Sequence, residues 1–193
     1  MTTNFNITPV QRYSKRPYFI GLLFFTAILF LNFKLPAQSN EYILKAVALE
    51  KIAMFVTWPG ETDATKQPQD FVIAVLANKK FGNILEDVYR DKKIKDKPVS
   101  VILISNIDEL ANCDILFIPS IKTDELQHVL DGLKGKPILT ISDTEGFAES
   151  GCFINFYEFE NKLRFEINQK EMLNTGFSID FRLLRVSKVI NPL

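Results

Sequence analysis

Short, continuous apolar runs recur through the middle of the chain and are separated by amphipathic segments. Runs of this kind, rich in Val and Ile, are typical of strands that are covered on both faces. The predicted strands are 71–77, 98–104, 114–120 and 137–143. The segments between them predict short helices at 79–93, 106–113 and 123–136. Strands that alternate with helices indicate βαβ crossovers, and therefore a parallel sheet with helices on both faces.

Local signals mark where the predicted helices begin and end. Asn106 is expected to cap the second helix, and Thr123 or Asp124 the third, because short polar side chains accept hydrogen bonds from free backbone N–H groups. Gly135 is expected to end the third helix, since glycine readily adopts the left-handed conformation that follows a helix.

The pattern changes in the last quarter of the chain. Residues 152–159 and 162–167 are two strand-like runs, and in the first run successive side chains alternate between the two faces. The runs are joined at Glu160-Asn161, which predicts an antiparallel hairpin. Residues 169–190 predict a helix, a break at Gly176 and a second helix. The predicted fold class is therefore α/β, with three layers. A mostly parallel sheet carries an antiparallel C-terminal hairpin, and helices lie on both faces.

Residues 41–57 predict a helix that is apolar on nearly every side and ends at Trp58-Pro59, because proline disfavours helical geometry in the preceding residue. Its charged residues point in different directions; they are Glu41, Lys45, Glu50 and Lys51. A helix without a wide polar face is expected to be covered by its neighbours. Trp58 is interpreted as a core residue, with an interface or ligand-platform role as the alternative.

Residues 1–37 have the layout of a secretory signal peptide, which leaves 38–193 as one domain. Three basic residues precede an apolar run at 18–31, and small residues follow at Ala37 and Ser39. The alternative is an uncleaved membrane anchor, although the run is shorter than the roughly 20 apolar residues that span a bilayer. Either way, the domain is expected to be periplasmic or secreted.

The charge balance argues against nucleic acid as a partner. Residues 1–37 hold four basic residues and no acidic ones, so the remaining domain carries 19 basic and 23 acidic residues and a net charge of −4. A mildly acidic domain without a basic stripe lacks the electrostatic footprint of a nucleic-acid-binding protein.

The residue types needed for catalysis are not grouped in this sequence. The single histidine, His128, lies among charged residues on a predicted helix and is interpreted as solvated. The sequence contains no ligand spacing typical of a metal site, no glycine-rich phosphate loop and no nucleophile elbow. We therefore expect no enzymatic activity, no metal and no cofactor.

Two further sets of residues are candidates for binding or for structure. Cys113 and Cys152 form either a disulfide, as an exported protein allows, or two buried thiols. Arg164 and Glu166 share one face of a predicted strand, as in an ion pair. The last predicted helix carries Arg182 and Arg185 three positions apart, where they bind either an anion or surface carboxylates.

Read together, several ordered segments resemble the YfiR-like family of exported regulatory proteins. The match runs from about residue 41 to 189. Its segments are EYILKAVALEKIAMFVTWP, FVIAVLANKKFGNILE, CDILFIPS, PILTISDTEGFAESGCFINF and KLRFEINQKEMLNTGFSIDFRLLRVSKVI. The most specific part is the order LTISD, GFA, INF, RFEIN and LL. Cys152 departs from the family pattern, which has a glycine at this position.

The resemblance implies a non-enzymatic periplasmic regulator. Such proteins bind the extracytoplasmic sensor domain of a membrane signalling protein and repress it. That protein is a diguanylate cyclase of YfiN type, whose output is cyclic di-GMP and biofilm behaviour, or a histidine kinase. An outer-membrane lipoprotein that sequesters the regulator, and a homodimer, are further expected partners. The alternative hypothesis is a periplasmic small-molecule or anion sensor that uses Arg164, Arg182 and Arg185.

Overall fold

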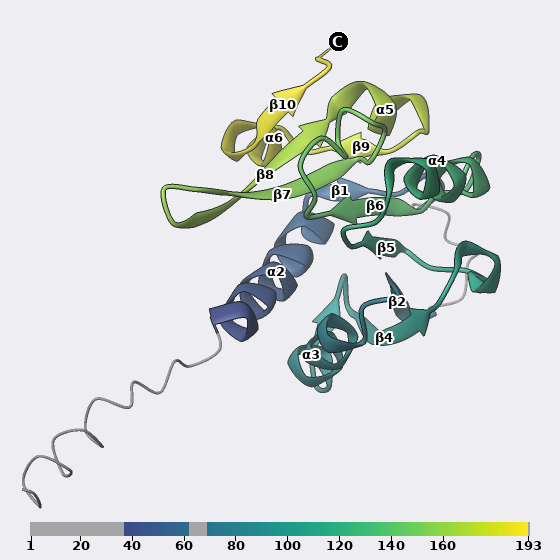
Figure 1. Cartoon of the computed structure of the whole chain (residues 1–193), viewed down its shortest axis with the longest axis vertical. Coiled ribbons are helices and arrows are strands. Elements are labelled where there is room, and N and C mark those ends of the chain that lie inside the picture. The colour runs from purple at the N-terminus through teal and green to yellow at the C-terminus, as the bar shows by residue number, and fades with distance from the viewer. Residues whose placement is uncertain (1–36, 62–68, 193) are drawn as a thin grey trace, which may run out of the picture. The chain divides into compact units, whose positions relative to one another are not determined.

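The computed structural model describes residues 37–61 and 69–192 (Figure 1). The chain divides into two units, Met1–Ala37 and Gln38–Leu193. The predicted signal peptide lies, apart from Ala37, outside the described residues, as do residues 62–68. Among the described residues, no helix combines the length and the apolar character needed to cross a membrane.

The elements of the second unit follow one another as α2 Ala37–Met54, β1 Val56–Thr57, β2 Phe71–Leu76, α3 Lys79–Tyr89, β3 Lys93–Ile94, β4 Lys97–Ile104, η1 Ile107–Glu109, β5 Ile115–Ile118, α4 Thr123–Gly132, β6 Leu139–Ser142, β7 Ile154–Phe159, β8 Lys162–Asn168, α5 Gln169–Asn174, β9 Ser178–Ile179, α6 Phe181–Val186 and β10 Lys188–Ile190. The predicted strands and helices are thus present, most of them with slightly different bounds, except that the helix predicted at 106–113 is only a three-residue 3₁₀ turn, Ile107–Glu109.

One large sheet organises the domain, with the strand order β10-β8-β7-β6-β5-β2-β4-β3. Pairing is parallel from β4 through β2, β5 and β6 to β7, and again between β8 and β10. It is antiparallel between β7 and β8 and between β3 and β4. β1 and β9 form a separate antiparallel pair. The predicted fold class, a mostly parallel sheet with an antiparallel C-terminal hairpin, is confirmed.

The hairpin turn lies where the sequence places it. Glu160 and Asn161 both have positive φ angles, 52° and 56°. A two-residue turn with both central residues in this region has the twist that antiparallel strands need. β7 and β8 therefore pair in register from Ile154↔Ile167 to Phe159↔Lys162.

Helices pack on both faces of the sheet, and each face has its own apolar cluster (Figure 1). On one face, Leu49 of α2 and Phe81 of α3 contact a cluster that includes Phe117 of β5. On the other face, Leu126 of α4 packs in a cluster with Ile118 of β5. Consecutive residues of β5 point to opposite faces, which is why its sequence is apolar at every position.

One predicted boundary is wrong, and two short strands were not predicted. The first helix ends at Met54 rather than at 57, because Val56 pairs with Ile179 as part of β1. The C-terminal segment contains two helices and, in addition, the short strands β9 and β10. Strands of two or three residues are too short to show a hydrophobic period in the sequence, so only the folded chain reveals them.

The ends of α4 also differ from the prediction. Its N-cap is Lys122, which makes no side-chain capping bond, and Thr123 is already helical. The helix ends at Gly132, whereas Gly135 takes a φ of +76° in the turn beyond it. By contrast, Asn106 caps η1 as expected, with its side chain accepting from the N–H of Asp108 at 3.0 Å.

Candidate functional site

The first turns of helix α2 are fastened to the carboxyl ends of the parallel strands. Lys45 is buried and its Nζ lies 2.5 Å from Oδ2 of Asp143, the residue that follows β6. Nearby, Asn78, which follows β2, donates a hydrogen bond of 3.1 Å to the hydroxyl of Tyr42. In open parallel sheets, ligands commonly bind in the crevice outside these strand ends. Here the first turns of α2 lie beside these strand ends, and the rest of the helix packs on one face of the sheet.

One side of α2 remains open to solvent. The exposed fractions are 43% for Ile43, 56% for Leu44, 39% for Val47 and 58% for Met54. We call these four residues the α2 surface. The expectation that neighbours cover this helix on every side is therefore wrong. Leu44, Val47, Lys51 and Met54 follow one another at spacings of three and four, which is the pattern of helix–helix contact faces.

Trp58 is part of the core. It is 8% exposed, and its ring lies edge-on to Phe71 and Phe177, with centroids 5.5 and 5.8 Å away. Its indole Nε1–H donates to the backbone oxygen of Asp114 at 3.0 Å. Lys95 lies over the ring, 4.9 Å from its centroid. The indole is thus held by packing and by a hydrogen bond, and only a small part of it reaches solvent.

Among the candidate arginines, Arg182 is already paired with a carboxylate of the protein itself. Arg182 binds Asp180 through both Nε and Nη2, at 3.0 and 2.7 Å, and its guanidinium also lies over Phe55. This pairing lowers the pKa of Asp180 to about 2. Arg164 and Arg185 are exposed. Since the Arg182 guanidinium is already neutralised, the arrangement resembles surface ion pairing more than ligand capture.

The two cysteines are free thiols, so the disulfide considered from the sequence is not formed in this structure. Cys152 is buried within the cluster beneath α4, and Cys113 packs at its edge. Burial raises the pKa of each thiol to about 12, with the charge of Asp114 adding to the effect at Cys113. Neither thiol has the lowered pKa of a reactive cysteine.

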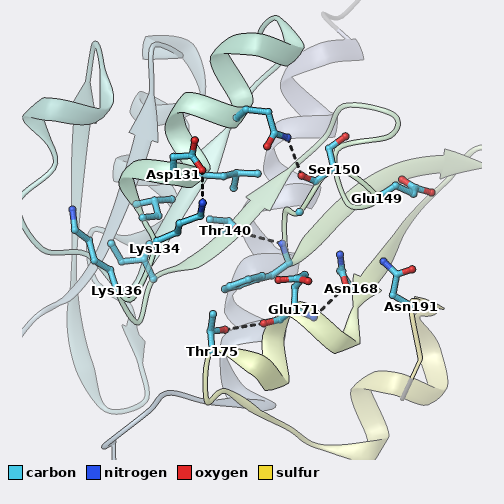
Figure 2. Close-up of a pocket in the computed structure, with 16 residues that line it drawn as sticks. Asp131, Lys134, Lys136, Thr140, Glu149, Ser150, Asn168, Glu171, Thr175 and Asn191 are labelled. Carbon is cyan, nitrogen blue, oxygen red and sulfur yellow. Dashed lines mark hydrogen bonds and ion pairs between the residues drawn. The ribbon is translucent and has the colours of Figure 1, made fainter.

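A groove of about 360 Å³ lies between α4, β6 and α5 (Figure 2). Several of its polar groups already bind the protein itself. Thr140 accepts a hydrogen bond from the backbone N–H of Phe153 at 2.9 Å, and Asn168 donates to the carbonyl of Ala148 at 2.8 Å. Lys134 pairs with Asp131 at 2.8 Å. The bonds of Thr140 and Asn168 hold the loop between β6 and β7, so these two groove residues serve the fold.

A second cavity, of about 450 Å³, lies beyond the end of β6. A polar row crosses neighbouring strands in register, with Ser142 beside Asn155, Asn155 beside Glu166 and Glu166 beside Lys188, and the last three of these residues line the cavity. Glu166 is 5% exposed and binds Nζ of Lys188 at 2.8 Å. Glu166 therefore pairs with Lys188 and not, as expected from the sequence, with Arg164. The sequence gives no sign of Lys188, because its pairing depends on the register of β10.

Within residues 37–61 and 69–192, no group of three or more His, Cys, Asp or Glu side chains is arranged to hold a metal ion. His128 lies exposed on α4, as the sequence suggests.

Known proteins provide a comparison for this arrangement. None of the curated proteins matches the chain. Among solved structures, one similar protein is an ABC domain from Streptococcus pneumonia, solved in complex with L-Trp. It shares 12% sequence identity and a TM-score of 0.45, and the match covers 62% of this chain and 55% of that protein. The chain thus spans little more than half of that protein.

The family described as YfiR/HmsC-like matches residues 42–188, from the first turns of α2 to the start of β10. This range includes the α2 surface and the polar row, and it coincides with the segments that carry the resemblance in the sequence. The chain belongs to the YfiR/HmsC-like family.

Proposed function

We propose that this chain is a non-enzymatic periplasmic regulator. It binds and represses the extracytoplasmic sensor domain of a membrane signalling protein, which is a diguanylate cyclase of YfiN type or a histidine kinase. The family supports this proposal, because YfiR-like proteins are periplasmic, are regulatory rather than catalytic, and interact with membrane sensor proteins. The proposed output of the cyclase is cyclic di-GMP and, through it, biofilm formation.

The α2 surface is the observation that carries the proposal. Leu44, Val47 and Met54 keep between 39% and 58% of their surface exposed, although burial of such side chains stabilises a protein. Anchors at helical spacing on one face are how an amphipathic helix docks onto a partner. The ion pair of Lys45 with Asp143 fixes this helix to the sheet, so the surface is already formed before a partner arrives.

A further apolar side chain, that of Phe181, extends the α2 surface at the C-terminal end of the helix. The N–H of Asp180 donates to the carbonyl of Phe55 at 2.9 Å, which joins the start of α6 to the end of α2. Phe181 follows and is 63% exposed. Exposed aromatic residues are frequent anchors in protein interfaces. We propose that Met54 and Phe181 contact the sensor domain together.

Two further partners follow from the same family resemblance. An outer-membrane lipoprotein is proposed to compete for the regulator and so release the sensor. A homodimer is the competing occupant of the α2 surface, because an exposed apolar stripe can also pair with its own copy. We also propose that a signal peptide directs export and is removed after Ala37 or Ser39. Mass spectrometry of the exported protein then shows a chain that begins at Gln38 or Asn40.

Deletion of the gene in its own bacterium tests the repressor role. If the partner is a cyclase, deletion should raise cellular cyclic di-GMP; if it is a kinase, deletion should raise phosphorylation of its response regulator. Re-expression of the wild-type chain should restore the lower level. Leu44→Glu should not restore it, because a charge on the α2 surface opposes burial.

A matched control is Leu103→Glu on β4, where the replaced side chain is 48% exposed. This variant should restore repression as the wild type does. Signalling output that stays unchanged after deletion, by both readouts, would contradict the proposed function.

A further inference from the structure

The outer edge of β8 is only partly covered. β10 pairs with β8 from Glu166 to Asn168, so the edge before Glu166 has no neighbouring strand on that side (Figure 1). Among the residues that the structure describes, no loop or helix forms a backbone hydrogen bond with residues 162–165 either. An open strand edge is a template for a further strand, because its backbone groups have no partner in the sheet.

Leu163 and Phe165 direct backbone groups to this open edge. The N–H of Asn168 donates to the carbonyl of Phe153 at 2.8 Å, so the backbone groups of Asn168 point to β7. Successive residues of a strand point their backbone groups to opposite edges. Ile167 therefore points away from β7, to β10, and Leu163 and Phe165 point the same way. The N–H groups of Leu163 and Phe165 and the carbonyl of Leu163 are available to an added strand.

Two unpaired cations stand beside the open edge on one face of the hairpin. Lys162 and Arg164 are exposed, and neither makes an ion pair within the part of the chain that the structure describes. Directly across β7, they face Phe159 and Tyr157, which carry no charge. The nearest carboxylate along the same face, that of Glu166, is already paired with Lys188. The two cations are therefore free to pair with carboxylates that arrive from outside.

The opposite face beside the edge is apolar. Leu163 and Phe165 are partly buried and pack against the apolar cluster that α2 and α3 share. Side chains of an extended segment point alternately to the two faces of a sheet. A strand laid along this edge thus places every second side chain beside Lys162 and Arg164, and the others beside Leu163 and Phe165. Such an edge favours a segment in which acidic and apolar residues alternate.

A second copy of the same edge fits poorly. In antiparallel pairing centred on Leu163, Lys162 lies opposite Arg164 of the other copy, and in pairing centred on Arg164, that residue lies opposite itself. Like charges directly opposite each other destabilise a sheet. The cations therefore oppose self-association through this edge and select a strand of opposite charge.

We propose that the open edge of β8 binds an extended segment of another protein in which acidic and apolar residues alternate. The segment adds a strand to the sheet through its backbone, and its carboxylates pair with Lys162 and Arg164. This edge contains no residue of the α2 surface, so its test and the test of the proposed function fail separately.

A blocked hexapeptide of alternating glutamate and valine tests this partner chemistry. Fluorescence anisotropy of the labelled peptide should show saturable binding to the mature protein. Hydrogen exchange should show that the amides of Leu163 and Phe165 gain protection when the peptide binds, as an added strand requires. The same peptide with lysine in place of glutamate should bind about tenfold more weakly or not at all.

Reversal of the edge charges should exchange this preference. The double variant Lys162→Glu, Arg164→Glu changes two exposed side chains, so it should fold as the wild type does. It should bind the lysine peptide better than the glutamate peptide. The matched control is Lys92→Glu, Lys93→Glu, two exposed residues at the opposite edge of the sheet, which changes the net charge equally and should bind as the wild type does.

Three results would each overturn the proposal. The first is a glutamate peptide that does not bind the wild-type protein, because Lys162 and Arg164 would then only guard the edge. The second is an equal loss of binding in both double variants, because net charge alone would then explain it. The third is binding without protection of the Leu163 and Phe165 amides, because the peptide would then not be paired with β8.

Discussion

Lys45 of α2 and Asp143 at the end of β6 form a buried ion pair, although they are 98 residues apart in the sequence. Glu41, one turn earlier in α2, also lies 2.5 Å from Nζ of Lys45. The lysine is thus held by two carboxylates, one from its own helix and one from the sheet. Together with the buried side chains of Leu49 and Ile52, this pair holds α2 against the sheet with the α2 surface outward.

Replacement of this lysine tests whether the pair fixes the helix. Lys45→Met leaves the half-buried Asp143 without its cation and should lower the free energy of unfolding by about 3 kcal/mol, as expected when one member of a buried pair is removed. Lys51→Met, on the exposed side of the same helix, should change it by less than about 0.5 kcal/mol. Urea unfolding measures both. Equal effects from the two variants would show that the ion pair does not hold α2.

The stability should fall at alkaline pH. Burial lowers the pKa of Lys45, but its bonds with Asp143 and Glu41 outweigh this and leave the pKa raised. Burial, and then the charge of Glu50, raises the pKa of Tyr89. A group with a raised folded pKa stabilises the protein fully below its unfolded pKa and loses this contribution as the pH approaches the folded value.

The stabilising contributions of Lys45 and Tyr89 should therefore be complete below pH about 10 and be lost above it. Urea unfolding between pH about 9 and about 11 measures the loss. Tyr89→Phe removes a hydroxyl that donates to the carbonyl of Ala46, so its stability should depend less steeply on pH than that of the wild type. An identical slope in this variant would exclude Tyr89 as a cause.

Trp58 is the single tryptophan of the chain, so its fluorescence reports on its own surroundings. Trp58→Ala should cost about 3–5 kcal/mol, as expected for loss of a buried aromatic side chain. Trp58→Phe retains a ring but loses the bond to the Asp114 carbonyl, and should cost about 1 kcal/mol. Thermal or urea unfolding separates the two. An unchanged stability in Trp58→Ala would instead place Trp58 in an interface.

The thiols should be unreactive in the folded protein. Their raised pKa of about 12 leaves almost no thiolate at neutral pH, and thiolate is the reactive form. A thiol reagent should therefore label Cys113 and Cys152 slowly in native protein and rapidly in denaturant, without prior reduction. Denatured, unreduced protein that shows no thiol would establish the disulfide.

The large elements follow from the sequence because their signals are local. Continuous apolar runs locate β2, β4, β5 and β6, and Glu160-Asn161 locates the hairpin turn. Each depends on periodicity or on the preference of one residue for a backbone conformation, so no long-range contact is needed to infer it.

The site residues depend on contacts between distant segments, and the sequence does not specify these. Helix α2 is apolar on most sides, so its pattern does not indicate which side the core takes up. The three-and-four spacing of Leu44, Val47 and Met54 is visible in the sequence, but only the position of α2 shows that this side is open. Glu166 is a candidate from the sequence, whereas its partner Lys188 depends on the register of β10.

Direct binding tests the central claim. The mature chain should bind the purified extracytoplasmic domain of the membrane cyclase or kinase that is encoded beside it. Leu44→Glu should weaken this binding by about 2 kcal/mol or more, roughly thirtyfold, while its unfolding stays like that of the wild type. Leu103→Glu should bind as the wild type does. If Leu44→Glu retains wild-type affinity, the α2 surface is not where this protein meets its sensor.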